Sequence, residues 1–173
     1  SHSWMPLSSS SSFSRVMSSP SAFAAVENSR PAENACTPSD VGSTSVPGLC
    51  AKPIVDVLVG LRELELSEEQ VDAMRGLGYE FLGEYGLQGR LFFRKEPRTI
   101  HVHVVTYGSE HWDRQLTFRD ALRSDAEERE RYAAFKRQLA AEGHPRDVYS
   151  ELKTPFIREV EARARARGVR PAV

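Results

Sequence analysis

The sequence is poor in the features that mark secreted, membrane-spanning or nucleic-acid-coating proteins. Its 173 residues include only two cysteines, Cys36 and Cys50, without the spacing of a disulfide framework or a zinc site. No apolar run approaches the length of a membrane span. A dominant charge is also absent, because 23 Lys and Arg balance 24 Asp and Glu for a formal net charge of −1. We therefore expect a soluble, cytoplasmic protein with no membrane contact, no strong nucleic-acid signal and Cys50 as a small packing residue.

The first forty residues differ in composition from the rest of the chain. Thirteen of them are serine and four are proline. Such a segment has too little apolar surface to offset the conformational entropy that ordering would cost. We predict a disordered leader over residues 1–40 and one domain over residues 41–173.

A glycine-rich turn followed by an apolar strand lies at the centre of this domain. Residues 41–60 read VGSTSVPGLCAKPIVDVLVG. Gly42 and Ser43 can present backbone N–H groups and a hydroxyl to an anion. In the strand predicted over residues 53–59, alternation places Asp56 and Leu58 on one face and three valines on the other. A carboxylate in such a strand needs a cation, a metal ion or a hydrogen-bond donor opposite it.

Three further runs predict strands of the same sheet. Residues 79–84 and 90–95 are separated by five residues that contain two glycines, a spacing typical of a hairpin. Residues 99–106 read TIHVHVVT, so alternation places His101 and His103 on one face. We expect a mostly antiparallel or mixed sheet.

The two histidines and Asp56 form a candidate metal set. Imidazoles at positions i and i+2 of one strand face can reach one point, and with Asp56 they would suit zinc, iron or manganese. An alternative is that one histidine is a hydrogen-bonded core residue and the other is solvated. A third is that either acts as a general base or donates to a phosphate.

Four helices are predicted from their starting residues and apolar spacing. Ser67 begins a capping-box pattern with Gln70, and Ser109 and Asp125 can each cap a later helix. The last helix begins near Arg146, and Pro155 must either kink it or open a new helix. Together with the strands, these elements indicate an α+β fold with a carboxyl-terminal helical layer.

Several other residues favour structural roles. Helical spacing places Trp112 and Tyr132 in the core rather than against a nucleotide base. The basic run over residues 158–167 suits a helix carboxyl end and predicts a solvated face. Arg119 and Asp120 are adjacent in the sequence, and we expect each to pair with a different residue.

The ordered segments resemble a known family. The Gly-Ser turn with its strand aspartate resembles the nucleotidyltransferase superfamily. The longer segments GSTSVPGLCAKPIVDVLV, LGYEFLGEYGLQGRLFFRK, RTIHVHVV, SEHWDRQLTFRDALR and YSELKTPFIREV, in this order, resemble the GrpB family. That family is also found fused behind dephospho-coenzyme A kinase. Its members usually place a long helix and a strand before the Gly-Ser turn, whereas we predict only a short helix there.

The resemblance implies a site and a class of ligand. Gly42 and Ser43 would hold phosphates, and Asp56 would be the first metal-binding carboxylate. The metal would be a divalent ion, Mg or Mn, or alternatively Zn. The second carboxylate of the superfamily pattern is Leu58 here. Cations at family-like positions would contact phosphate, foremost Lys52, Arg94 and Lys153, and also Arg90, Arg119 and Lys136.

The resulting functional hypothesis is metal-dependent nucleotidyl or phosphoryl transfer to an unknown acceptor. In this hypothesis Asp56, His101 and His103 are both metal ligands and catalytic residues. The partner would be a nucleotide or another phosphorylated small molecule. The alternatives are a non-catalytic nucleotide- or coenzyme-binding module, which Leu58 favours, and an interaction scaffold.

Overall fold

The computed structural model describes residues 37–169, apart from residues 53, 98 and 99. It divides the chain into two compact units, with the division after Gln115, inside helix α4 (Glu110–Ser124). Residues 1–36 of the predicted leader lie outside the described residues.

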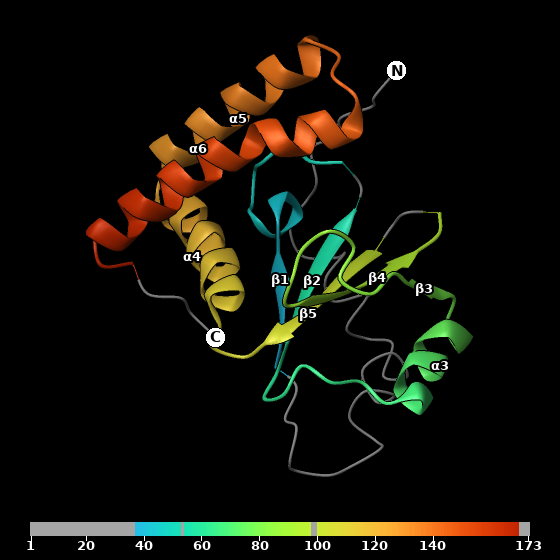
Figure 1. The fold of residues 1–173 in the computed structure, drawn as a ribbon. Coiled ribbons are helices and arrows are strands. Elements are labelled where there is room, and N and C mark those ends of the chain that lie inside the picture. Colours follow the sequence, from blue (N-terminus) through green and yellow to red (C-terminus); the bar gives the residue numbers. More distant parts are fainter. Residues whose placement is uncertain (1–36, 53, 98–99, 170–173) are drawn as a thin grey trace. The chain divides into compact units, whose positions relative to one another are not determined.

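The first unit is built on a mixed five-stranded sheet. Its strands are β1 (Thr37–Val41), β2 (Val55–Leu61), β3 (Tyr79–Phe81), β4 (Arg90–Lys95) and β5 (Ile100–Thr106). The spatial order is β1-β2-β5-β4-β3 (Figure 1). The β2–β5 pair is parallel and the other three pairs are antiparallel. The predicted α+β class with a mixed sheet is confirmed.

Strand β1 begins inside the segment that the sequence assigned to the leader. Its residues pair with β2 from Thr37 opposite Gly60 to Val41 opposite Asp56. The prediction of disorder is therefore wrong for residues 37–40. The run TPSDV has one large apolar residue and Pro38, but an edge strand tolerates proline because one side of its backbone needs no partner in the sheet. Pairing with β2 supplies the stability that local sequence does not.

One face of the sheet is apolar and carries the core of the unit. Its cluster includes Val57 and Val59 from β2, Val102 and Val104 from β5 and Phe93 from β4. Helix α3 (Glu68–Gly76) adds its buried residues to the same cluster. The predicted capping box starts this helix, with reciprocal hydrogen bonds between its cap serine and the glutamine three residues on. The opposite face of β2 and β5 carries Asp56, His101 and His103.

The second unit consists of the rest of α4 with α5 (Ala126–Ala141) and α6 (Arg146–Ala166). Asp125 caps α5 as predicted, accepting hydrogen bonds from the backbone N–H groups of Glu127 and Glu128. Helix α6 continues through Pro155 as one element. Among the described residues, no helix combines the length and apolarity that crossing a membrane requires.

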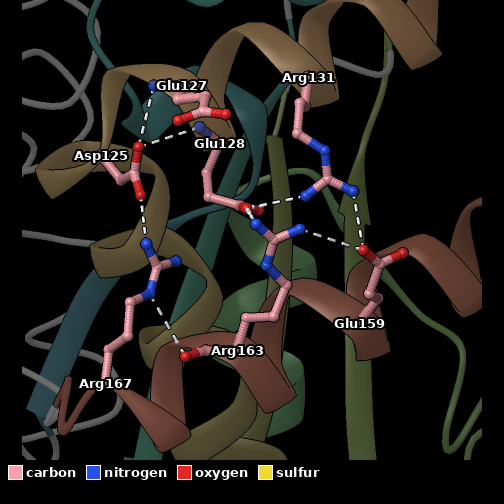
Figure 2. Close-up of polar contacts among 7 residues, drawn as sticks. All are labelled: Asp125, Glu127, Glu128, Arg131, Glu159, Arg163 and Arg167. Atoms are coloured by element: carbon pink, nitrogen blue, oxygen red, sulfur yellow. Dashed lines mark hydrogen bonds and ion pairs between the residues drawn. The ribbon is translucent and has the colours of Figure 1, made fainter.

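Part of the basic run on α6 is engaged in ion pairs rather than only solvated. Glu128 is 1% exposed and pairs with Arg131 at 2.8 Å and Arg163 at 3.0 Å (Figure 2). Both arginines also pair with Glu159, and Arg167 pairs with Asp125. Arg158, Arg163, Arg165 and Arg167 are all exposed, as predicted for a solvated face, and two of them, Arg163 and Arg167, also pair with carboxylates at the start of α5.

Two smaller expectations are also corrected. Cys50 is exposed rather than packed, because it lies between Leu49 and Ala51, whose side chains are the buried ones. Arg119 and Asp120 pair with each other, since Arg119 Nε lies 2.6 Å from Asp120 Oδ1.

Candidate metal and anion site

A row of side chains crosses the polar face of the sheet through all five strands. Residues paired directly across neighbouring strands point to the same face. The pairings are Val41 with Asp56, Asp56 with His101, His101 with Arg94, and Arg94 with Glu80. Sheet register therefore brings together one carboxylate and one imidazole that are far apart in the sequence.

His103 completes the cluster from the next position of β5 on the same face. Its Nε2 lies 3.3 Å from Asp56 Oδ1, and Nδ1 of His101 lies 3.1 Å from the same oxygen. One ligand atom from each of Asp56, His101 and His103 lies within 4.8 Å of the others. Among the described residues this is the one group of three or more potential metal ligands that converges in this way.

Two of the three ligand-atom separations in the cluster fit a metal ion of zinc size. Ligand atoms in a tetrahedral site with bonds of about 2.0–2.1 Å lie about 3.3–3.4 Å apart. The two N···O separations, 3.1 and 3.3 Å, come close to this value. The remaining ring nitrogens, His101 Nε2 and His103 Nδ1, are buried without a hydrogen-bond partner among the described residues. These two nitrogens are not the ones that face Asp56, so they would not be the ligands of an ion in this site.

Asp56 is held in its ionised form by its neighbours. Burial alone raises the pKa of the Asp56 carboxyl, because desolvation penalises the charge. Hydrogen bonds from His101 and His103, together with the electrostatic interaction between these residues and the carboxylate, outweigh this effect and lower the pKa below its ordinary value. A carboxylate that stays ionised can serve as a metal ligand without first losing a proton.

Gly42 lies directly against this carboxylate. A Cβ placed on Gly42 would lie 2.7 Å from Asp56 Oδ2, and its backbone has φ +72° and ψ −169°. Only glycine adopts that conformation readily. The turn that follows, Ser43–Ser45, is one turn of 3-10 helix, closed by a hydrogen bond from Ser45 Oγ to the Gly42 carbonyl. The structure thus brings the Gly-Ser turn beside Asp56.

A core residue occupies the position two residues after Asp56, where the resemblance led us to look for a second carboxylate. Leu58 is completely buried and pairs with His103 across the β2–β5 ladder. It offers no oxygen to a metal ion. The cluster is therefore one carboxylate and two imidazoles, a donor set that suits zinc, iron or manganese better than magnesium, which prefers oxygen ligands.

The predicted phosphate-binding cations are dispersed. Arg94 lies in the row beside His101 and pairs with Glu80 at 2.5 Å and with Glu96 at 3.4 Å. Lys52 lies shortly before β2 and is half-buried.

The other candidate cations have local partners of their own. Arg90 lies 4.9 Å from the ring of Phe92. In the second unit, Lys153 lies 4.9 Å from the ring of Tyr149 and Lys136 4.9 Å from that of Tyr132, while Arg119 is 4% exposed. The structure therefore brings one cation from this group, Arg94, into the row of Asp56 and His101.

Two aromatic residues beside the cluster were missed from the sequence. The ring of Phe92 lies 5.2 Å from that of His101 and 5.1 Å from that of His103. Tyr85 stacks on Phe92, whereas Trp112 and Tyr132 are buried, as their helical spacing predicts. The sequence signal was the alternation of β4, which puts Phe92 on the histidine face once the sheet order is known.

Comparison with known families identifies one match over most of the chain. A family model described as GrpB protein matches residues 20–163. The UPF0157 protein YqkA of Bacillus subtilis is 39% identical over 129 residues, covering 72% of this chain and 37% of that protein. A UPF0157 protein of Streptomyces coelicolor is 39% identical over 127 residues, covering 73% of this chain and 67% of that protein. The chain thus spans about a third to two thirds of these relatives.

A solved structure shares the architecture. The crystal structure of the conserved protein GrpB from Enterococcus faecalis superposes with a TM-score of 0.71 at 35% sequence identity. The match covers 88% of this chain and 91% of that one. The sheet and helices described above are therefore those of that protein's fold.

Proposed function

This chain belongs to the GrpB family, and from that premise we propose that the polar face of its sheet holds a divalent metal ion at Asp56, His101 and His103. At this ion the chain would bind a phosphorylated ligand for nucleotidyl or phosphoryl transfer. The observation that carries the proposal is the convergence of two imidazole nitrogens on Asp56 Oδ1, at 3.1 and 3.3 Å. Among the metals that bind well to one carboxylate and two imidazoles, manganese and zinc are the first to test.

The residues of the chain would divide the work in a simple way. When bound, the ion supplies charge neutralisation for phosphate oxygens and polarises the group under attack. Asp56 and the two imidazoles fix its position. The absent Cβ of Gly42 lets the glycine turn lie against Asp56, and the Ser43 hydroxyl and the Arg94 guanidinium are the candidates to hold phosphate oxygens.

A second candidate function is a nucleotide-binding module without turnover. Leu58 favours it, because a buried leucine stands where a transferase of this superfamily carries another metal-binding carboxylate. One protein carboxylate leaves more of the coordination to imidazoles, water and the ligand itself. Binding of the same ligand class is common to both candidates, and only turnover separates them.

Calorimetric titration of metal-depleted protein tests the proposal. We expect one Mn²⁺ or Zn²⁺ per chain, and tighter binding of inorganic tripolyphosphate when the metal is present. Asp56→Asn should weaken metal affinity at least about tenfold, since even groups that only support metal ligands contribute 10- to 100-fold. Release of pyrophosphate from a nucleoside triphosphate would indicate nucleotidyl transfer, release of the nucleoside diphosphate would indicate phosphoryl transfer, and binding without either product would indicate the module.

A matched control comes from another aspartate of the first unit. Asp72 is exposed and pairs with Arg75 on α3, so Asp72→Asn changes the charge equally but should leave metal affinity unchanged. Equal metal binding by wild type and Asp56→Asn would show that the proposed centre is wrong.

A further inference from the structure

An exposed aromatic ring is stacked beside the candidate metal cluster. Tyr85 belongs to the loop between β3 and β4 and is 60% exposed. Its ring lies 5.4 Å from that of Phe92 with 17° between the planes. Phe92 in turn contacts the rings of His101 and His103. Aromatic contacts therefore run without a break from the imidazoles to a tyrosine ring that reaches solvent.

The loop holds this ring in place. Two backbone carbonyls, those of Glu84 and Tyr85, each accept a hydrogen bond of 3.0 Å from the Arg90 guanidinium. The Gly89 N–H donates to the Glu84 carboxylate at 2.8 Å. The same guanidinium lies 4.9 Å from the centre of the Phe92 ring. The loop backbone at Tyr85 is thus held by hydrogen bonds, and the Tyr85 ring rests on Phe92.

The backbone of Tyr85 is also unusual. Its φ of +45° is the one positive φ at a residue other than glycine among the described residues. Such conformations cost about 1–3 kcal/mol and persist only where the surroundings enforce them, which is most frequent at ligand sites. A glycine would adopt the conformation freely, but it would not supply the ring.

We infer that Tyr85, backed by the buried Phe92, forms a stacking platform for the base of a nucleotide whose phosphates are held by the metal ion proposed at Asp56, His101 and His103. The inference rests on the proposed function and names its ligand class. The ring centroid of Phe92 lies 5.4 Å from that of Tyr85 and 5.1 Å from that of His103. A nucleoside triphosphate is therefore long enough to reach from the Tyr85 ring to the proposed metal centre. Every base offers a flat π face, so an exposed, fixed tyrosine can stack on it without reading its edge.

The test compares ATP with inorganic tripolyphosphate, each titrated into Mn²⁺-loaded wild type and Tyr85→Ala. Tyr85→Ala should weaken ATP binding about 5- to 100-fold, the usual effect of removing one stacking ring. It should leave tripolyphosphate binding unchanged. Tyr85→Phe should bind ATP like wild type. Leu87→Ala, a change at another exposed apolar residue of the same loop, should change neither affinity.

The outcomes separate this inference from the function on which it rests. Equal effects of Tyr85→Ala on ATP and tripolyphosphate, or none on either, would overturn the platform and leave the metal-anion site standing. Binding of ATP that depends on Tyr85 without any binding of tripolyphosphate would support the platform and contradict the metal-anion site. Failure of both ligands to bind would overturn both.

Discussion

At the scale of single residues, Gly42 connects the glycine turn to the proposed metal centre. Its backbone has φ +72° and its missing Cβ leaves room for Asp56 Oδ2. Gly48 has a similar φ of +78°, but a Cβ there would meet no atom within 4 Å. Comparing alanine variants of these two glycines therefore separates the effect of backbone strain from that of a collision with the Asp56 carboxylate.

We predict that Gly42→Ala lowers the free energy of unfolding by at least about 2 kcal/mol and weakens Mn²⁺ affinity, because strain and displacement of Asp56 add together. Gly48→Ala should cost about 1–2 kcal/mol, the strain alone, and leave Mn²⁺ affinity unchanged. Urea unfolding and metal titration provide the two readouts. Equal behaviour of the two variants would mean that Gly42 has no special relation to Asp56.

The residues of the candidate site show what alternation in a sequence can predict and what it cannot. Period-2 alternation correctly put His101 and His103 on one face of their strand. It could not show that this face adjoins Asp56, because that depends on parallel pairing between β2 and β5, whose register pairs Asp56 with His101. Tyr85 was missed for a different reason. Its contact with Phe92 depends on the conformation of a loop, which no periodic pattern encodes.

At the scale of elements, helices α5 and α6 are joined by charge as well as by apolar contact. Glu128 is buried on α5 and has two cationic partners, Arg131 on α5 and Arg163 on α6 (Figure 2). A buried carboxylate is strongly destabilising when no partner remains. Either arginine alone would still compensate its charge.

We predict that Arg131→Met and Arg163→Met each cost about 1 kcal/mol, whereas the double variant costs about 3–5 kcal/mol. Methionine retains much of the apolar stem of arginine, so the change is mainly one of charge. A double-mutant cycle, with each free energy of unfolding measured in urea, shows by how much the double variant loses more stability than the two single variants together. Additive single effects would show that the two arginines do not share the task of neutralising Glu128.

Arg137→Met is the matched control on the same helix. Arg137 pairs with Glu130, and both side chains are more than half exposed. Exposed pairs contribute about 0–1 kcal/mol, so this variant should lie close to wild type. A loss as large as that of the double variant would point to helix propensity or solubility instead of the buried charge.

The elements also show where local sequence signals were sufficient. Ser67, Ser109 and Asp125 were recognised as helix starts, and each accepts a backbone hydrogen bond in the first turn of its helix. Strand β1 was missed because its stability comes from β2 rather than from its own composition. The burial of Glu128 was missed because an acidic residue in a first helical turn is ordinarily exposed and favoured by the helix dipole.

At the scale of the whole molecule, the fold brings together a few residues that the sequence keeps far apart. Gly42, Asp56 and the two histidines come from three segments of the first unit, and the sheet alone places them within contact. The second unit supplies none of these residues. Family membership is established by the comparisons, and the chemistry of the family is what the site allows us to propose.

The central claim is that Asp56, His101 and His103 coordinate one divalent ion. X-ray absorption spectroscopy of the protein loaded with one equivalent of Zn²⁺ tests it most directly. We expect scattering from two imidazoles and at least one oxygen at about 2.0–2.1 Å, with one imidazole lost in His103→Ala. An ion surrounded only by oxygen, or a spectrum unchanged in both His103→Ala and Asp56→Asn, would contradict it.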